Sequence, residues 1–359
     1  MKRYLIWILL ISLIIFRYFT TRPVYHNGDM VRITSTIMSD PVHYPTSQYI
    51  KIAGLKTYLP LFPEVSYGQR IIVEGVVNTD KLDNDKKLDK PKLIKIEDSK
   101  SVGSNFRNSI INFYQKTLPD PEAGLIAGSV LGAKGALTQD FWNQVKNTGV
   151  AHVVVASGTN VTFVVSFLIT VLTLFLPRPK AIPFVIFGII LYLFISGFDA
   201  PLIRAAIMAT VVFTANETGR IVSTWRVLIL TAGIMLIIKP DWLVDIGFIL
   251  SFVSTASLML FERKIRLKLK FLPEIAKEGL STSLAAQIGV APILFVTFGQ
   301  FNILSPIINA LVLWTIPFIM ILGAMGGAIG LIFPFIGKLI LYICYPFAWW
   351  FVRVIEIFN

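Results

Sequence analysis

Long apolar runs, separated by short polar or basic segments, fill the second half of the chain. Their residues are 150–176, 181–197, 200–217, 222–238, 242–261, 280–298, 303–330 and 334–356, and one more apolar run occupies residues 4–20. A helix needs roughly 20 apolar residues to cross the hydrocarbon core of a bilayer, and most of these runs are close to that length. The pattern predicts a polytopic α-helical membrane protein with about nine spans.

The first apolar run is expected to remain in the protein. Lys2 and Arg3 precede it, it continues to Phe19, and no small-residue cleavage site follows it. A cleaved secretory signal would show such a site after its apolar core. Residues 1–22 are therefore predicted to form an N-terminal transmembrane span.

Residues 24–100 are polar and alternate between apolar and polar positions. This alternation, typical of half-buried strands, is found in Val31–Ile37, Gln48–Leu55, Gly68–Val77 and Lys92–Glu97. About five short strands in so short a stretch predict a small OB-like β-barrel. The charged run Asp80–Lys92 is expected to form a flexible hairpin loop.

Residues 101–148 show apolar positions at helical spacing. Phe106–Leu118 has an apolar side with Arg107 and Lys116 on the other side, and Gln139–Asn147 is similarly amphipathic. A further helix is expected at Pro121–Leu131, after the prolines that end the first one. We expect this segment to form interfacial amphipathic helices.

The sequence GVAHVVVASGTN, Gly149–Asn160, interrupts what would otherwise be a plain apolar span. Ser157, Gly158 and Asn160 favour turns and tolerate non-helical backbone. Irregular backbone at membrane depth persists only where it is buried in protein or lines a water-filled cavity. The segment therefore indicates a polar pathway through the membrane rather than an inert anchor.

The chain has 33 Lys and Arg against 21 Asp and Glu, a formal net charge of +12. Basic cytoplasmic loops would explain this excess, and so would attraction to a polyanion such as nucleic acid. Basic residues at Arg178 and Lys180, at Arg220 and Arg226, and in Glu262–Lys277 fall on one side if every span crosses. That side is expected to be the cytoplasm, which places the polar strand-rich region on the outer side.

Composition excludes several kinds of chemistry. Cys344 is the only cysteine, so disulfides within the chain and cysteine-based metal or iron–sulfur sites are excluded. The sequence also lacks the histidine and carboxylate clusters of metal sites and the phosphate-binding P-loop. We therefore expect no metal and no cofactor.

A serine hydrolase within the membrane is one candidate. Ala156, Ser157 and Gly158 resemble a nucleophile turn, and a nucleophilic serine needs a base. His152 lies five residues before Ser157, which in a continuous helix places the two side chains about 140° apart. A break at Ser157 would be needed to bring them together.

Polar groups inside the predicted spans are the remaining candidates. Arg204 is costly inside a membrane and is expected to face a cavity or a partner; the alternatives are an ion pair with an aspartate or a side chain that reaches the membrane surface. Gln287 and Asn309 would either line a pathway or hydrogen-bond one helix to another. The full set is Asp199, Arg204, Asp245, Ser251, Gln287, Asn302 and Asn309.

Four ordered stretches together resemble the ComEC family of competence proteins. They are GVAHVVVASGTNV (Gly149–Val161), SGFDAPLIRAAIM (Ser196–Met208), KPDWLVDIGFILSF (Lys239–Phe252) and LAAQIGVAPILFVTFGQFNILSPIINALVLWTIP (Leu284–Pro317). The resemblance extends over most of residues 122–320. It implies that residues 149–359 form a competence-type transmembrane channel domain and that residues 24–100 are the family's extracytoplasmic OB-like domain.

The chain departs from the family pattern in three respects. Asn160 stands where the family motif has a second histidine, and one span precedes the OB-like region. We also expect a short form of the family, without the metallo-β-lactamase-like domain that many members carry.

The resemblance implies a channel, not an enzyme, that passes single-stranded DNA across the bacterial cytoplasmic membrane during DNA uptake. Residues implied to line or support the channel are His152, Ser157, Gly158, Asn160, Arg204, Asp245, Ser251, Gln287 and Asn309. DNA contacts in the OB-like domain are expected at Tyr49, Lys51, Lys56, Tyr58 and Arg70, because exposed aromatic and basic side chains bind single strands; the alternative is an ordinary solvated surface.

The partners implied are single-stranded DNA, membrane lipid, an external DNA receptor, a separate nuclease and a cytoplasmic motor. Two other functions stay open: the serine hydrolase at Ser157, and a transporter of small solutes. A small-solute transporter needs no receiving domain of the OB type, so that region argues against it.

Overall fold

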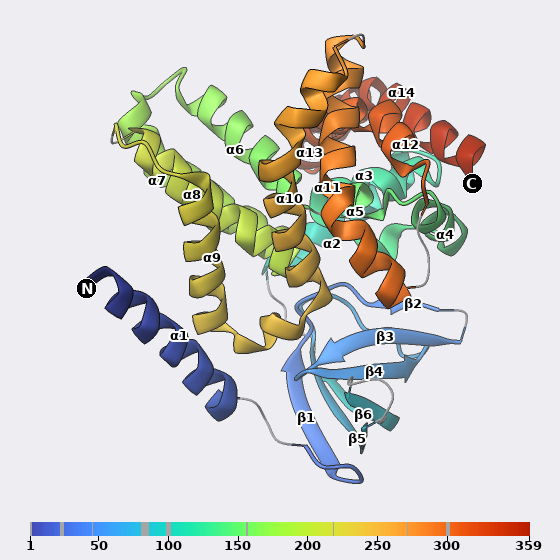
Figure 1. Ribbon diagram of the computed structural model, residues 1–359. Helices are drawn as coiled ribbons and strands as arrows, with labels where there is room; N and C mark the ends of the chain where they lie inside the picture. The colour runs from blue at the N-terminus through green and yellow to red at the C-terminus, as the bar shows by residue number, and fades with distance from the viewer. Residues whose placement is uncertain are drawn as a thin grey trace.

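The computed structural model describes residues 2–21, 25–44, 46–79, 86–97, 102–155, 157–217, 219–270, 272–298 and 302–359. Residues 80–85 of the charged run and Ala156 of the interrupted span lie outside the described residues. A β domain formed by the early part of the chain lies against one end of a helical bundle formed by the rest (Figure 1).

A six-stranded sheet forms the β domain. Its strands are β1 (Met30–Thr36), β2 (Val42–His43), β3 (Ser47–Ile52), β4 (Leu55–Pro60), β5 (Arg70–Thr79) and β6 (Lys86–Glu97), in the order β1-β5-β6-β4-β3-β2. All neighbours pair antiparallel except β4 and β6, which run parallel.

The predicted barrel is wrong, because the sheet is open. β1 and β2 stand at its two edges, and no pairing joins them among the described residues. A barrel closes only when its edge strands pair along their length. The two residues of β2 are too few to form such a seam.

Two strands begin or end where the alternation pattern did not predict. Gln48–Leu55, expected as one strand, turns at Ala53 and Gly54, whose φ angles are 47° and 83°. Positive φ at two successive residues is typical of the tight hairpin turn that here joins β3 to β4. The charged run, expected as a loop, is strand from Lys86 onward because it pairs with β5.

The β domain buries one face of its sheet. Ile50, Leu55, Leu59, Ile71 and Leu88 belong to this core. Because successive side chains of a strand point to opposite faces, the residues that alternate with them in β3 and β4 lie on the outer face.

The helical part begins with α1 (Lys2–Thr21) and continues after the sheet. Its helices are α2 (Val102–Thr117), α3 (Glu122–Leu131), η1 (Lys134–Ala136), α4 (Gln139–Asn147), α5 (Ala151–Val154), α6 (Gly158–Leu172), α7 (Arg178–Ser196), α8 (Ala200–Glu217), α9 (Thr224–Ile238), η2 (Pro240–Val244), α10 (Ile246–Lys268), α11 (Glu274–Phe298), α12 (Ser305–Val312), η3 (Leu313–Thr315), α13 (Ile316–Gly330) and α14 (Pro334–Phe358).

Six stretches of the described residues are long and apolar enough to cross a membrane. They are Ala151–Leu172, Arg178–Ser196, Ile246–Lys268, Lys277–Thr297, Ser305–Gly330 and Pro334–Phe358. A multi-pass membrane protein is therefore supported, but the prediction of about nine spans is wrong. α9 has only 15 residues, α8 contains Arg204 and Glu217, and the apolar stretch described in α1 is Ile11–Thr20.

The segment between the sheet and the spans contains a helix at the centre of the molecule. All of α3, Glu122–Leu131, is buried, and it packs against α2, α13 and α14. Glycines on α13 permit this approach: a Cβ atom on Gly323 would lie 2.9 Å from side-chain carbons of Ile126 and Val130. Whether residues 101–148 lie at a membrane interface stays a prediction.

The basic loops and the sheet lie at opposite ends of the molecule. The connections α6–α7, α8–α9 and α10–α11 are at the end farthest from the β domain (Figure 1). The other ends of α7, α8 and α10 approach the β domain and its neighbours, through Phe194, Asp199 and Asp245. This arrangement agrees with the charge pattern, in which every strongly basic loop falls on one side.

Candidate functional site

The interrupted span is broken in the structure. α5 ends at Val154, and Val155 (φ −93°, ψ 148°) and Ser157 (φ −119°, ψ 173°) have extended backbone before α6 begins at Gly158. Turn-forming residues at this position were the sequence signal for such a break. In the first turn of α6, the N–H of Asn160 donates to the carbonyl of Ser157 at 3.1 Å.

Side chains of the break hydrogen-bond to one another and to α3. The hydroxyl of Ser157 lies 3.1 Å from both Thr159 Oγ1 and Asn160 Oδ1. Asn160, which is 1% exposed, donates from Nδ2 to the carbonyl of Ser129 at 2.8 Å. Asn160 therefore holds the start of α6 against the buried helix α3.

Arg204 lies on α8, directly beside the start of α6. Its Nε donates to Ser251 Oγ at 2.7 Å and its Nη1 to Thr255 Oγ1 at 2.5 Å, both on α10. A Cβ atom on Gly158 would lie 3.0 Å from Arg204 Nη2, so the glycine lets the guanidinium lie close to the backbone of α6. The predicted residues Gly158, Arg204 and Ser251 thus meet at one point, where α6, α8 and α10 come together.

The partners of Arg204 in the described residues are neutral. Besides the two hydroxyls, they are Met208 Sδ at 3.5 Å and the ring of Phe252, whose centroid is 5.9 Å from the guanidinium carbon. The alternative of an ion pair between Arg204 and an aspartate is wrong, because Asp199 pairs with Lys134 at 3.2 Å and Asp245 with Lys51 at 3.3 Å. The guanidinium is half-buried with its charge uncompensated by a carboxylate in this part of the chain.

The other predicted channel residues lie apart from this point. Asn309 donates to Ser283 Oγ at 2.8 Å, joining α12 to α11. Asp245 caps α10 by accepting from Phe248 N at 3.1 Å. His152 is exposed on α5, and Gln287 is half-buried on α11 without a hydrogen bond among the described residues.

Four of the predicted DNA contacts share the outer face of the β3–β4 hairpin. Tyr49 is paired with Tyr58 and Lys51 with Lys56, and the rings of Tyr49 and Tyr58 are 5.2 Å apart. We call this surface the tyrosine face; Tyr44, with its ring 6.2 Å from that of Tyr58, and Lys87, with Nζ 5.4 Å from the same ring, extend it. Such a combination of rings and ammonium groups is suited to stacking bases and neutralising phosphates.

The remaining predicted contacts of the β domain differ from this group. Arg70 is exposed at the start of β5, where it pairs with Thr36 and Glu97 of the neighbouring strands. Lys51 is already engaged by Asp245, so it links the β domain to α10.

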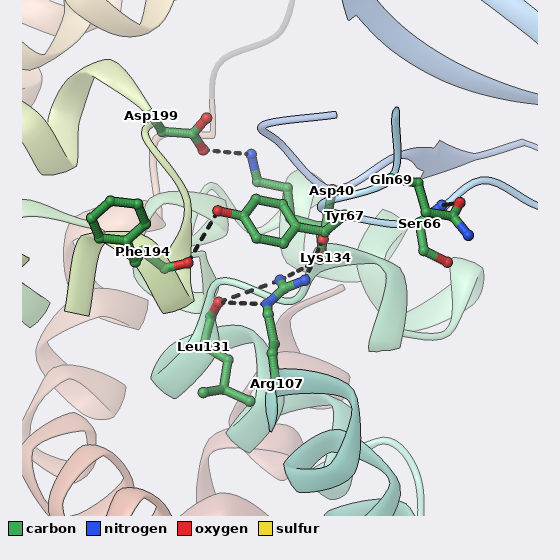
Figure 2. A network of polar contacts seen from close by, with 9 residues as sticks. All are labelled: Asp40, Ser66, Tyr67, Gln69, Arg107, Leu131, Lys134, Phe194 and Asp199. Carbon is green, nitrogen blue, oxygen red and sulfur yellow. Dashed lines mark hydrogen bonds and ion pairs between the residues drawn. The ribbon is translucent and has the colours of Figure 1, made fainter. Parts of the chain in front are cut away.

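A buried ion pair fixes the β domain to the bundle (Figure 2). Arg107 of α2 donates two hydrogen bonds, of 2.6 and 2.7 Å, to the carboxylate of Asp40 in the β1–β2 loop, and the two side chains are 3% and 8% exposed. Arg107 was expected on the polar outer side of an amphipathic helix, and that expectation is wrong because the β domain covers this side. The guanidinium also donates to the carbonyl of Leu131, the last residue of α3.

Tyr67 is a second element of this junction (Figure 2). Its ring lies 4.7 Å from the guanidinium carbon of Arg107, and its hydroxyl donates to the carbonyl of Phe194 on α7 at 3.2 Å. Burial raises the pKa of the Tyr67 hydroxyl, which keeps the proton needed for this hydrogen bond in place. The junction therefore joins the sheet, α2, α3 and α7 through the hydrogen bonds of Arg107 and Tyr67.

Comparison with protein families identifies the helical part of the chain. The family model described as "Competence protein" matches residues 129–359, which is more than half of the chain. The chain belongs to the competence protein family.

A curated relative supports the assignment. This competence-family protein is 26% identical over 226 residues to ComE operon protein 3 of Bacillus subtilis (strain 168). The matched part is 63% of this chain and 29% of the relative, so the chain spans less than a third of that protein's length in the comparison. No solved structure was found to match.

Sequence reasoning missed several residues of this competence-family protein. Thr255 follows Ser251 by four residues, and residues four apart share a helix face. Once Ser251 was a candidate, Thr255 could therefore have been predicted to lie beside it. The ion pair of Asp40 and Arg107 could not be predicted in this way, because the two residues are 67 positions apart in the sequence. No cluster of three or more potential metal ligands occurs among the described residues.

Proposed function

We propose that this competence-family protein passes single-stranded DNA across the bacterial cytoplasmic membrane during DNA uptake. The observation that carries the proposal is Arg204, an arginine inside a helical bundle at a break in a span, with hydroxyl partners and no carboxylate among the described residues. A positive charge in this setting attracts an anion that passes it, and the nucleic-acid backbone supplies one phosphate per nucleotide.

The tyrosine face supports the same proposal from the other side of the membrane. It lies on the β domain, at the end opposite the basic loops, and positive loops face the cytoplasm. An incoming strand would meet aromatic rings first and the arginine second. Lipid surrounds the spans, while an external receptor, a separate nuclease and a cytoplasmic motor would complete the uptake system.

Ser157 gives little support to the alternative of an intramembrane hydrolase. Its hydroxyl is bonded to Thr159 and Asn160, and no hydrogen bond joins it to His152 in the described residues. A nucleophilic serine needs a base within hydrogen-bond reach.

The test measures uptake of labelled DNA and membrane abundance in the same cells. Arg204→Gln is expected to abolish uptake while the protein still accumulates, and Arg204→Lys should retain part of it, because the charge persists without the planar fork. Arg353→Gln is a matched control, since Arg353 is exposed on α14, where it pairs with Glu356, and the substitution should leave uptake unchanged. Normal uptake by Arg204→Gln would refute the proposal.

A further inference from the structure

A pocket of about 250 Å³ lies between β2 and the η1–α4 segment, at the boundary of the β domain and the bundle. It is lined by Val42, Glu64, Lys134, Leu137, Gln139 and Trp142. None of these residues belongs to the helix break or to the hairpin that carries the tyrosine face.

The charges of the pocket disfavour a phosphate. Lys134 is the only cation among the described residues of the lining, and its ammonium group already pairs with Asp199 at 3.2 Å. Glu64, on the loop between β4 and β5, adds a carboxylate, so the two formal charges of the lining cancel. A neutral group with hydrogen-bonding edges suits the pocket better.

The chemistry of the lining favours a flat ring. Trp142 is half-buried and lines the pocket, with Lys146 Nζ 5.9 Å from its ring centroid, and Leu137 adds an apolar contact. Gln139, whose Nε2 donates to Asn143 Oδ1 at 3.4 Å, places an amide at the rim, and amides commonly hydrogen-bond to base edges. An aromatic platform with a few polar groups at its rim is suited to a nucleobase.

The pocket continues the tyrosine face. Val42 of β2 is paired with Tyr49 of β3, and paired residues of adjacent strands point to the same face of a sheet. Tyr49 is in turn paired with Tyr58. A strand lying across the tyrosine face would therefore reach the pocket by following the sheet from β4 through β3 to β2.

We propose that this pocket takes one nucleobase of the single strand, stacked on the indole of Trp142, as the strand passes from the β domain towards the bundle. The inference rests on the proposed function and adds a site to it. Stacking makes the site tolerant of sequence, because every base has a π face.

The experiment uses the full chain in lipid nanodiscs and a fluorescent oligothymidylate at low salt. Trp142→Ala is expected to weaken binding about tenfold, and Trp142→Phe to recover part of the loss, because a smaller ring still stacks. Trp225→Ala is the matched control, since Trp225 is an exposed tryptophan at the start of α9. Photocrosslinking with 5-iododeoxyuridine in the oligonucleotide should label the peptide that contains Trp142.

The outcomes separate this site from the proposed function. If the wild-type protein does not bind the oligonucleotide, the proposed function itself fails. If Tyr58→Ala weakens binding but Trp142→Ala does not, the strand uses the tyrosine face and the pocket inference is overturned. It is equally overturned if Trp142→Ala lowers only the yield of folded protein, because Trp142 would then be a membrane-interface anchor.

Discussion

At the scale of residues, the buried ion pair of Asp40 and Arg107 holds the β domain against the helical bundle. Both side chains are almost fully buried, and the guanidinium is held by two carboxylate oxygens and one backbone carbonyl. Burying such a pair stabilises little, but removing one partner leaves a charge in a place that water does not reach. Its role is to fix the position of the β domain.

Asp40→Asn is therefore expected to destabilise the protein by about 3–5 kcal/mol. Thermal unfolding of the purified protein in detergent would measure the loss as a lower melting temperature. Glu356→Gln is a suitable control, because Glu356 pairs with Arg353 on the surface of α14 and such pairs contribute little. Equal melting temperatures for the two variants would contradict the proposed role of the buried pair.

Substitution of Ser157 distinguishes a channel from a hydrolase. Ser157→Ala removes one hydroxyl that bonds to Thr159 and Asn160, so a channel should lose only part of its DNA uptake. A hydrolase would lose essentially all turnover, because its nucleophile would be gone. Labelling of wild type but not of Ser157→Ala by a fluorophosphonate would show that the hydrolase is the correct function.

The sequence predicted several of the polar residues that meet in the structure, but it did not predict their hydrogen-bond partners. Gly158, Arg204 and Ser251 were chosen separately and meet in the structure. An ion pair of Arg204 with an aspartate was one alternative, but both candidate aspartates bind lysines, and the hydroxyl partners of Arg204 were not predicted as a pair with it. Pairing depends on how helices pack, and the periodicity of one helix carries no information about its neighbours.

At the scale of elements, α13 and α14 pack through glycines. A Cβ atom on Gly337 of α14 would collide with backbone atoms of Gly330 on α13, and one on Gly326 would lie 2.8 Å from Leu341. Backbone atoms cannot move aside as a flexible side chain does. Close approach of this kind is how membrane helices gain van der Waals contact.

Gly337→Ala is expected to destabilise the bundle by about 1–3 kcal/mol, the usual cost of overpacking. The measurement is thermal inactivation of the purified protein, compared with Ile343→Ala, which changes an exposed residue of the same helix. Equal rates of thermal inactivation for the two variants would contradict the close packing of α13 against α14.

The sequence predicted the long helices better than it predicted the sheet. Apolar runs identified the long helices, because length and hydrophobicity are local properties. Alternation identified strands, but not the turn at Ala53 and Gly54 or the open sheet, since both depend on pairing between distant segments. Residues 200–217 and 222–238 were counted as spans because both runs are mostly apolar, although α8 contains Arg204 and Glu217 and α9 has only 15 residues.

At the scale of the whole molecule, the separation of the β domain from the basic loops predicts a topology. Cysteine at Asn78, exposed on β5, and at Lys268, exposed at the end of α10, should react with an impermeant reagent from opposite sides of the membrane. Cys344 is replaced first, and it is buried in any case. Reaction of both positions from one side would show that the orientation is wrong.

Under the proposed function, the basic loops at the end of the bundle farthest from the β domain would reduce the electrical work of moving DNA. A strand that moves from the β domain to that end carries phosphates towards a negatively charged interior, against about 2.3 kcal/mol per elementary charge for each 100 mV of membrane potential. Arg178, Arg220 and the run Glu262–Lys270 belong to the basic loops, and under the proposed function their positive charge would act on the strand within a Debye length of about 10 Å. The residues that orient the protein during insertion would thus also lower the final barrier for its cargo.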